Sequence, residues 1–563
     1  MKSFPITGIL SKLAVCLLVS MICCFVSCGN KKPENKQVAK PEEMNTVVQD
    51  GLKAMLAAAD GTGKINDSIK LKCLPVVKYY YAANNYLPVW SSEEKWAPFT
   101  SSFYTYLDSC ERDGLLPQAY GINSLKKYRT ILTDSVARTH SANWANAELL
   151  LSDAFFNILQ DLKQGRLQAD SNAWKYNKEK QEHFFSAALK KLQAGQSVNE
   201  IFQQAQPTLA PYLALRMAVP AFVDSMDRKS YTYLHYPNKD SLSFQRRLLK
   251  RLAESGFTVA TEKPDSAMLS DVITRYQKAR KLKVTGKLSA ALVKQLNNTD
   301  AEKFKRIAVT LDRYKQLPES LPQKYIWVNI PSYQLKVWSA DTLIMESRVV
   351  VGKSGTPTPF INSAISDIIV YPTWTIPNSI IVKEILPALK RNPGYLARKG
   401  YGLYTYDGKA VDPYSVNWAK YSKGIPYMVR QGSGDNNALG VIKFNFPNSH
   451  SVYLHDTNQR YLFKNSDRSL SHGCVRVQEW EKLATFIVRN DSIEFKGPDS
   501  LRLSADSITS WVKKKERHIM PIKSRMPVFI RYFSVEGTNE GIKFYDDIYG
   551  DDKKLRERYL TQN

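Results

Sequence analysis

Apolar residues recur at helical spacing across the first half of the chain. The segment "AELLLSDAFFNILQDLKQGRL" ends at Gly165, and its apolar face is formed by Leu149, Leu150, Ala154, Phe155, Ile158 and Leu162. The segments "KYYYAANNYLPVW" and "ERDGLLPQAYGI" mix aromatic residues with proline and glycine, which is typical of helix ends and loops. We predict a helical scaffold domain over residues 51–239, without a catalytic group of residues.

Residues 240–297 have the pattern of a small three-helix module. One apolar helical stripe, which closes before Gly256, consists of Phe244, Leu248, Leu249 and Leu252. The segment "DVITRYQKARKLKVTGKLSAALVKQLN" then predicts a second helix, a turn at Gly286 and a third helix. A further helix is predicted within the linking segment 298–322.

After Pro318 the apolar residues no longer recur at helical spacing but at every second position, as in a β-strand. The segment "YIWVNIPSYQLKVWSADTLIMESRVVVG" alternates between apolar and polar residues, with hairpin turns predicted at Pro331-Ser332 and Ala340-Asp341. Strands are also predicted in "DIIVYPTWTIP", "GVIKFNFP" and "SVYLHDT", and a helix is predicted in "QEWEKLATFIVRN". Residues of about 380–430 break the β pattern and predict an insertion within a mostly β domain over 323–500.

The C-terminal segment, 501–563, predicts a helix and a β hairpin that complete this mostly β half. The strands of the predicted hairpin are "PVFIRYFSV" and "GIKFYDDIYG". The whole pattern indicates an α+β multidomain protein, in which helical domains precede a mostly β domain.

The first 28 residues have the pattern of a lipoprotein signal peptide. Lys2 and Lys12 precede an apolar run that ends at Val26, and Ser27-Cys28-Gly29 follow. The ending "FVSC" is similar to a bacterial lipobox, in which the cysteine is lipidated and becomes the mature N-terminus. An uncleaved anchor is the alternative, although the run is short for a membrane span. Residues 29–50 are predicted to form a disordered polar tether.

The chain is strongly basic, with 79 Lys and Arg against 53 Asp and Glu, and a formal net charge of +26. This balance favours contact with nucleic acid, a membrane surface or an acidic polymer, or simply describes a lysine-rich surface. The sequence contains no concentrated basic tract and no nucleic-acid module, so we do not expect a nucleic-acid partner. The oligomeric state is not indicated.

Three cysteines remain outside the N-terminal segment: Cys73, Cys110 and Cys474. Export implies an oxidising compartment, where Cys73 and Cys110 either pair or stay as buried free thiols. Cys474 is then the odd thiol, and it lies within "SLSHGCVRV". A packed thiol, a metal ligand and a nucleophile are the alternatives for it.

Two histidines are placed to activate Cys474 as a nucleophile. His455 lies 19 residues upstream, at the end of the strand "SVYLHDT", and two adjacent strands would bring both residues together. His472 precedes Cys474 by two residues, so an extended segment would point both side chains to one face. Gly473 permits close approach of a carbonyl group, and Arg476 is placed to bind a carboxylate.

Each of these residues also has a structural interpretation. A lone cysteine is commonly a small buried hydrophobe, a lone histidine a satisfied polar residue, and Arg476 an ion-pair partner. Zinc binding by Cys474, His472, His455 and His450 is disfavoured because no Cys-x-x-Cys or His-Glu-x-x-His spacing is present.

The stretch "YLHDT…SLSHGCVRV" resembles the active-site signature of the L,D-transpeptidases, a histidine followed by Ser-His-Gly-Cys. The segments "RQGSGDNNALGVIKFNFPNSHSVYLHDT" and "FYDDIYGDD" are similar to the large subtype of this family. In that subtype a helical scaffold domain and a peptidoglycan-binding module precede the catalytic domain, so the resemblance covers about residues 60–555.

The resemblance implies a role for each residue of the signature. Cys474 would be the acylated nucleophile and His455 its general base, oriented by the backbone carbonyl of Asp456. The backbone amides of Gly473 and Cys474 would bind the oxyanion. The substrate would be bound by Ser471, His472, Arg476, Tyr453 and Trp374, under a lid formed by the insertion. Arg476 stands where many smaller members carry asparagine, as in the large subtype.

The resemblance also implies a reaction. The thiolate would attack the bond between the diamino acid and the terminal D-Ala of a peptidoglycan tetrapeptide stem. The resulting thioester would pass to the amine of a second stem and form a 3→3 cross-link, or to water in an L,D-carboxypeptidase. No cofactor or metal is required, and carbapenems should acylate Cys474. The enzyme would be lipid-anchored in the envelope of a Gram-negative-type bacterium, facing the periplasm, with the outer membrane expected over the inner.

Two other classes of protein remain as alternatives. In papain-like peptidases the cysteine precedes its histidine, whereas His455 precedes Cys474 and the only downstream histidine is His518. A non-catalytic, wall-binding lipoprotein would use the module at 240–297 but would not need a Cys/His pair. Attachment of a protein to peptidoglycan would use the same donor chemistry as the transpeptidase.

Overall fold

The computed structural model describes residues 36–66, 69–167, 178–238, 240–261, 265–340, 342–498, 502 and 504–561. The predicted signal peptide, with Cys28, lies outside these residues. The chain divides into two compact units. Unit 1 contains residues up to 207, 314–316 and 559–563, and unit 2 contains 208–313 and 317–558. No described helix is both long and apolar enough to cross a membrane.

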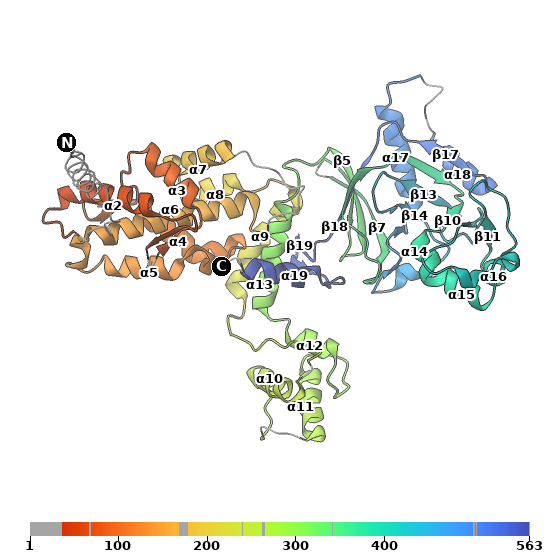
Figure 1. The fold of residues 1–563 in the computed structure, drawn as a ribbon, viewed down its shortest axis with the longest axis horizontal. Coiled ribbons are helices and arrows are strands. Elements are labelled where there is room, and N and C mark those ends of the chain that lie inside the picture. Colours follow the sequence, from red (N-terminus) through yellow and green to blue (C-terminus); the bar gives the residue numbers. More distant parts are fainter. Residues whose placement is uncertain are drawn as a thin grey trace, which may run out of the picture. The chain divides into compact units, whose positions relative to one another are not determined.

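Unit 1 is helical, as the apolar spacing predicts. Its helices are α2 (Met44–Ala58), α3 (Leu74–Ala83), α4 (Thr100–Ser109), α5 (Ile122–Ile131), α6 (Ser141–Gln164), α7 (Lys178–Gln193) and α8 (Val198–Ala205). Two short hairpins pair β1 (Lys64–Asn66) with β2 (Ile69–Lys70) and β3 (Ser91–Ser92) with β4 (Lys95–Trp96). The long helix α6 lies among the others (Figure 1) and is buried on almost every side.

A buried carboxylate ties α6 to the β3 segment. Glu148 is fully buried and accepts hydrogen bonds from the backbone N–H groups of Val89 and Trp90, at 2.8 and 2.9 Å. The hydroxyls of Ser91 and Tyr81 donate to the same carboxylate at 2.7 and 3.0 Å. Burial raises the pKa of Glu148, and these hydrogen bonds act in the opposite direction.

We expect Glu148→Ala to lower the free energy of unfolding by about 3–5 kcal/mol, because it leaves several buried donors without an acceptor. Chemical denaturation followed by tryptophan fluorescence measures this loss. Glu148→Gln, which keeps one acceptor oxygen and the shape, should lose clearly less. Equal midpoints for the alanine variant and the native chain would contradict the assignment of Glu148 as the organising acceptor.

The prediction of a disordered tether over 29–50 is wrong for residues 36–50. A 3-10 helix (Pro41–Glu43) leads into α2, and the Val38 N–H donates to the Thr139 carbonyl at 2.8 Å. Val38, Met44 and Val48 are buried in the core of unit 1. Residues 29–35 lie outside the described part of the chain.

The two cysteines of unit 1 are free and buried. The Cys73 backbone N–H donates to the Asp153 carboxylate at 2.7 Å, and Cys110 lies in the same apolar core. Burial raises the pKa of both thiols above the ordinary value, so both stay protonated and unreactive.

In unit 2, the predicted three-helix module is present. It comprises α10 (Ser241–Glu254), α11 (Ser266–Ala279) and α12 (Ala290–Leu296), which share one apolar core. Helix α9 (Ala210–Ser225) packs against the strand β19 (Val535–Thr538), so this part of the predicted scaffold groups with unit 2. Helix α13 (Asp300–Tyr314) follows the module.

One large sheet dominates unit 2. Its strand order is β17-β9-β13-β14-β16-β7-β6-β5-β18-β8, and β15 pairs with β7 beside this path. The bounds are β5 (Lys324–Asn329), β6 (Gln334–Ser339), β7 (Thr342–Gly352), β8 (Ile361–Ala364), β9 (Asp367–Val370), β13 (Ile442–Asn445), β14 (Leu454–His455), β15 (Ser469–Ser471), β16 (Val475–Val477), β17 (His518–Pro521) and β18 (Pro527–Arg531). The predicted meander is confirmed, because β5, β6 and β7 are consecutive antiparallel neighbours.

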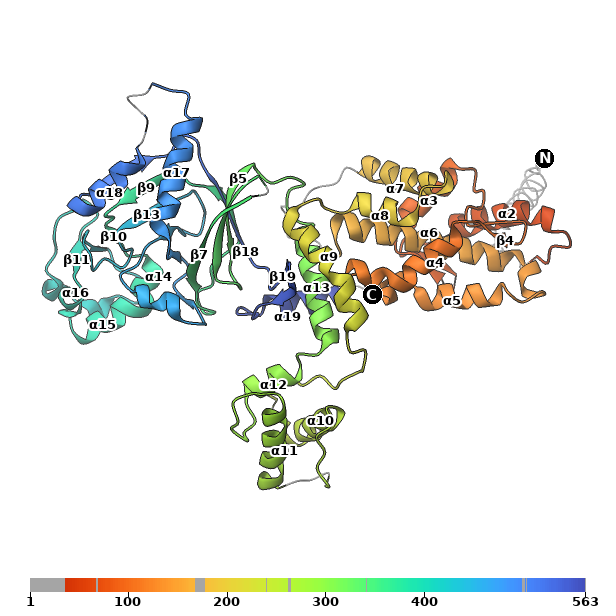
Figure 2. The same cartoon turned by 180° about the vertical axis from the view of Figure 1, so that it is seen from behind.

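Two helices cover one part of this sheet. Helix α17 (Trp480–Glu494), which was predicted, and α18 (Ala505–Lys514) contribute side chains to the same apolar core as β9 and β13. Figure 2 shows both helices beside these strands. Their packing anchors the sheet at β9 and β13, next to the strand β14.

The predicted insertion is a small subdomain with its own apolar core. Its sheet has the order β10-β12-β11, with bounds β10 (Trp374–Thr375), β11 (Tyr401–Tyr404) and β12 (Met428–Gln431). Its helices are α14 (Asn378–Ile380), the π-helix η5 (Ile381–Ile385), α15 (Leu386–Arg391) and α16 (Tyr395–Arg398).

The predicted C-terminal hairpin is wrong in its first strand. The segment "PVFIRYFSV" contains β18, which joins the large sheet parallel to β5, and it ends at the first residue of β19. The hairpin is formed by β19 and β20 (Gly541–Phe544), and α19 (Asp551–Thr561) follows. Alternating apolar residues indicate a strand but do not specify its partner.

Candidate active site

Two adjacent parallel strands bring Cys474 and His455 to one face of the large sheet. Strand β14 pairs with β16 so that Leu454 lies opposite Val475 and His455 lies opposite Arg476. The Val475 N–H donates to the Tyr453 carbonyl at 3.2 Å. In the pair that precedes Leu454 and Val475, Tyr453 therefore lies beside Cys474. His455 is therefore one pair further along the same face.

The turn before Cys474 is held by side-chain hydrogen bonds. Gly473 has a φ of +122°, and its N–H donates to the Ser471 hydroxyl at 3.1 Å. The Ser471 hydroxyl donates to the Cys474 carbonyl at 2.6 Å, and Thr358 donates to the Gly473 carbonyl at 2.8 Å. The backbone bends at His472 and Gly473, so the predicted extended segment is wrong here.

His472 turns toward the insertion instead of toward the cysteine. Its Nε2 lies 2.6 Å from a carboxylate oxygen of Glu384 in η5, and Lys353 is 4.0 Å from the same oxygen. Glu384 was not singled out in the sequence, because nothing in the insertion predicts which of its residues reaches this turn. The contact joins the predicted lid to the turn before Cys474.

The His455 ring is buried and held by a backbone carbonyl. Its Nδ1 donates to the Asp456 carbonyl at 2.5 Å, the contact expected from the resemblance. Burial, with the positive charges of Arg476 and Lys443, lowers the pKa of His455 to about 3, although the carbonyls of Asp456 and Leu439 act in the opposite direction. The imidazole is therefore neutral at physiological pH.

The Asp456 carboxylate fixes the chain around this histidine. Its Oδ2 accepts from the Val441 N–H at 3.1 Å and from the Arg460 guanidinium at 2.9 Å. Gly440 has a φ of +63°, and a Cβ atom at this position would lie 2.2 Å from Asp456 Oδ2. Gly440 is thus required both by its backbone conformation and by the close approach of a carboxylate.

We expect Gly440→Ala to lower the free energy of unfolding by about 2 kcal/mol or more and to slow any reaction that depends on His455, because the methyl group displaces Asp456. Thermal unfolding and acylation rates measure the two effects. Gly400→Ala is the matched control, since Gly400 has a φ of +68° and no atom near its Cβ position. Equal losses in both variants would show that strain alone, and not the displacement of Asp456, causes the effect.

Cys474 is partly exposed, and its thiol lies 3.9 Å from the Ser451 carbonyl. Burial of the sulfur raises the pKa of the thiol, whereas hydrogen bonds from Tyr453 and the charges of Lys443 and Arg476 act in the opposite direction. The resting thiol is therefore protonated, and a base must remove its proton before attack.

Tyr453, Trp374 and Arg476 line the same site. Burial raises the pKa of Tyr453, and its phenol interacts with Cys474 and with the Trp374 indole. The Trp374 Nε1 forms no hydrogen bond of good geometry, although it is buried. Arg476 donates to Gln459 at 3.0 Å, and its Nε is buried without a partner.

Lys443 of β13 is the further site residue that sequence reasoning missed. It pairs with His455 across the β13–β14 ladder, and its Nζ lies 4.1 Å from the centroid of the Tyr453 ring. The only sequence feature that could have indicated Lys443 as a site residue is its place as a lysine within a short predicted strand. Within the described residues, no group of three or more His, Cys, Asp or Glu side chains is arranged to hold a metal ion.

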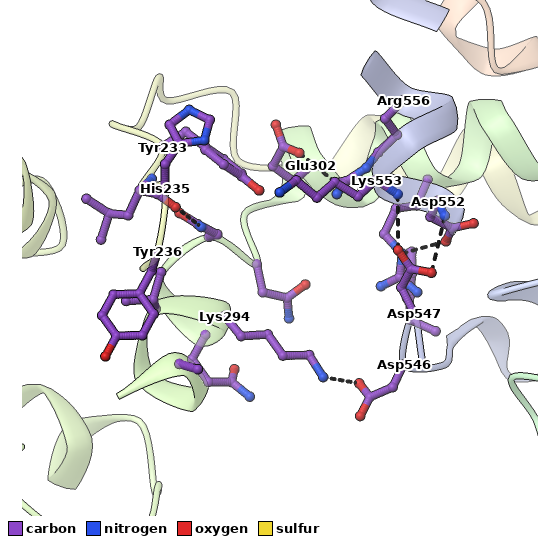
Figure 3. Close-up of a pocket in the computed structure, with 18 of the residues that line it drawn as sticks. Tyr233, His235, Tyr236, Lys294, Glu302, Asp546, Asp547, Asp552, Lys553 and Arg556 are labelled. Carbon is purple, nitrogen blue, oxygen red and sulfur yellow. Dashed lines mark hydrogen bonds and ion pairs between the residues drawn. The ribbon is translucent and has the colours of Figure 1, made fainter. Parts of the chain in front are cut away.

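A pocket of about 460 Å³ lies elsewhere in unit 2 (Figure 3) and contains none of the predicted site residues. Figure 3 shows charged side chains of the C-terminal segment facing Tyr233, His235 and Tyr236. Two ion pairs join charges of its wall, Lys294 with Asp546 at 2.6 Å and Arg556 with Glu302 at 2.7 Å. Paired charges indicate a structural role for these side chains.

Comparison with known proteins identifies two parts of the chain. Residues 323–495 match the family model of the L,D-transpeptidase catalytic domain, and residues 75–219 match the Scaffold domain. A Haemophilus influenzae protein described as a candidate L,D-transpeptidase is 35% identical over 250 residues. This match covers 44% of the present chain and 48% of that protein, so the chain spans about half the length of this curated relative.

Solved structures overlap with parts of the chain. An L,D-transpeptidase from Mycobacterium smegmatis is 10% identical, with 37% of this chain and 58% of that chain covered and a TM-score of 0.18. Mycobacterium tuberculosis L,D-transpeptidase 1 is 11% identical, with 37% and 61% covered and a TM-score of 0.16. On these sequence matches, residues 323–495 resemble an L,D-transpeptidase catalytic domain and residues 75–219 resemble a Scaffold domain.

Proposed function

We propose that this protein is an L,D-transpeptidase that acts on peptidoglycan tetrapeptide stems through a thioester on Cys474. The observation that carries the proposal is the placement of Cys474 and His455 on one face of β16 and β14, within the matched catalytic domain. The neutral His455 and the protonated thiol are the resting forms that general-base activation requires.

The reaction begins with proton removal by His455. Because Nδ1 donates to the Asp456 carbonyl, the neutral ring keeps a lone pair on Nε2 to accept the thiol proton. The sulfur attacks the carbonyl between the diamino acid and D-Ala, the C–N bond breaks, and D-Ala leaves with the proton from His455. The amine of a second stem then attacks the thioester, the C–S bond breaks, and the amide of a 3→3 cross-link forms while His455 carries the proton of the amine back to the Cys474 sulfur. Water as the acceptor gives a carboxypeptidase instead.

Other residues bind the substrate and the developing charge. The backbone N–H groups of Gly473 and Cys474 are proposed to hold the oxyanion, and the Gly473 N–H must leave the Ser471 hydroxyl to do so. Ser471, Tyr453, Trp374 and Arg476 are proposed to form the walls of the donor site. The contact of His472 with Glu384 supports the insertion as a lid over this site.

The remainder of the chain is proposed to keep the enzyme at its polymer. Cys28 carries the lipid that anchors the chain in the envelope, facing the periplasm from the outer membrane. The module of α10–α12 binds peptidoglycan, and the net charge of +26 favours an anionic wall. The lipid anchor, the module and the acceptor identity rest on the sequence resemblance.

Intact-protein mass spectrometry tests the proposal directly. The purified full-length chain is mixed with a tetrapeptide stem that ends in D-Ala, and separately with a carbapenem. The expected result is a single adduct on the Cys474 peptide, with release of D-Ala from the stem. A folded chain without either adduct would overturn the proposal and favour a non-catalytic, wall-binding protein. An adduct that passes only to water would replace the transpeptidase with an L,D-carboxypeptidase.

A further inference from the structure

The imidazole of His455 is flanked by a cation on each side. Lys443 on β13 pairs with His455 in the antiparallel ladder, and Arg476 on β16 pairs with His455 in the parallel ladder. Residues paired across neighbouring strands share a face of the sheet. Lys443, His455 and Arg476 therefore form one row across three strands, on the face that holds Cys474.

Lys443 also reaches the cysteine through Tyr453. Its ammonium lies 4.1 Å from the centroid of the Tyr453 ring, and that ring lies 5.6 Å from the His455 ring. The Tyr453 phenol interacts with the Cys474 thiol. The Lys443 ammonium lies over the Tyr453 ring, and the phenol of that ring interacts with the Cys474 sulfur. The position of Lys443 therefore determines the position of the Tyr453 ring against Cys474.

The charge of Lys443 is not neutralised by an ion pair in the described part of the chain. The groups that act on it are Cys474 and the Asp367 carboxylate on β9, and burial lowers its pKa. Arg476 likewise donates to the neutral side chain of Gln459. Two unneutralised cations beside a partly buried sulfur favour the thiolate over the thiol, and they disfavour a protonated imidazole.

We propose that Lys443 is a positioning residue for acyl transfer, which holds the Tyr453 ring against Cys474 and, together with Arg476, supplies the fixed positive charge that stabilises the thiolate. The sequence comparisons assign nothing to Lys443. The proposal rests on the proposed function for its catalytic meaning, whereas its electrostatic part concerns the cysteine alone.

The test measures thiolate formation without using the enzymatic reaction. The full-length chain is alkylated with iodoacetamide between pH 6 and 11, and the rate is read on the peptide that contains Cys474. Lys443→Met removes the charge and keeps the shape, and we expect the midpoint of the pH profile to move upward by about one pH unit. The direction follows because loss of a nearby positive charge raises the pKa of a thiol.

Two variants separate charge from packing. Lys443→Arg keeps the charge and should restore the native midpoint, while Lys336→Met removes a charge that pairs with Glu346 on β7 and should leave the midpoint unchanged. Should Lys443→Met fail to fold by circular dichroism, Lys443→Gln replaces it in the same experiment. An unchanged midpoint in the neutral variants, or a shift of equal size in Lys336→Met, would overturn the proposal.

The stem-acylation rate of the same variants separates this proposal from the proposed function. A shifted midpoint together with slower acylation supports both. A native chain that is alkylated with the expected pH dependence but never acylated by a stem contradicts the proposed function and leaves the electrostatic role of Lys443 supported.

Discussion

Cys474→Ala should form no adduct with a tetrapeptide stem or a carbapenem, and stem turnover should fall by about 10⁴-fold or more. The reason is chemical, because an alanine methyl group cannot form the thioester on which both half-reactions depend. Stopped incubations followed by intact-protein mass spectrometry measure the loss. The fold should be unaffected, since the thiol is partly exposed and only weakly bonded to the Ser451 carbonyl.

The matched control for this variant is the removal of a thiol that is not in the site. Cys110→Ala should keep full adduct formation, although it removes a buried side chain and should lower the free energy of unfolding by about 1–2 kcal/mol. Thermal unfolding of both variants distinguishes loss of chemistry from loss of fold. Persistent acylation of a folded Cys474→Ala chain would place the nucleophile elsewhere.

His455→Ala should slow acylation by about 10²-fold or more, because the resting thiol then has no base to accept its proton. The geometry supports this role, since the ring is buried and neutral and its Nδ1 is committed to the Asp456 carbonyl. Single-turnover acylation at pH 7 measures the rate, and alkaline pH should recover part of it in the variant, where hydroxide in solution forms the thiolate.

His472→Ala is the informative partner of the His455 variant. His472 contacts Glu384 in the insertion, so its loss should weaken binding of the donor more than it slows the chemical step. A larger loss of single-turnover rate in His472→Ala than in His455→Ala would show that the base is His472. Equal rates in His455→Ala and the native chain would remove His455 from the mechanism.

Local patterns predicted the elements of the fold, and their partners were harder to predict. The apolar spacing around Phe155 indicates α6, and the alternation after Pro318 indicates the β5–β6–β7 meander, because both depend on nearby residues. The strand β18 was predicted as a strand but not as the parallel neighbour of β5, about 200 residues away in the chain. Residues 36–50 were predicted as a tether because their average composition is polar, although Val38, Met44 and Val48 are buried.

The residues of the candidate site likewise fall into those that the sequence indicated and those that only the structure revealed. Cys474 and His455 carry a recognisable motif, and the sequence by itself indicated the resemblance to the L,D-transpeptidases, the nucleophile candidate and the histidine that precedes it. Only the tertiary structure decided that Tyr453 is the neighbour of the cysteine, that His472 contacts Glu384, and that Cys73 and Cys110 are free. It also placed Lys443 beside His455. The physical reason is that strand register and non-local packing depend on the whole sheet, whereas a motif is contained in a few consecutive residues.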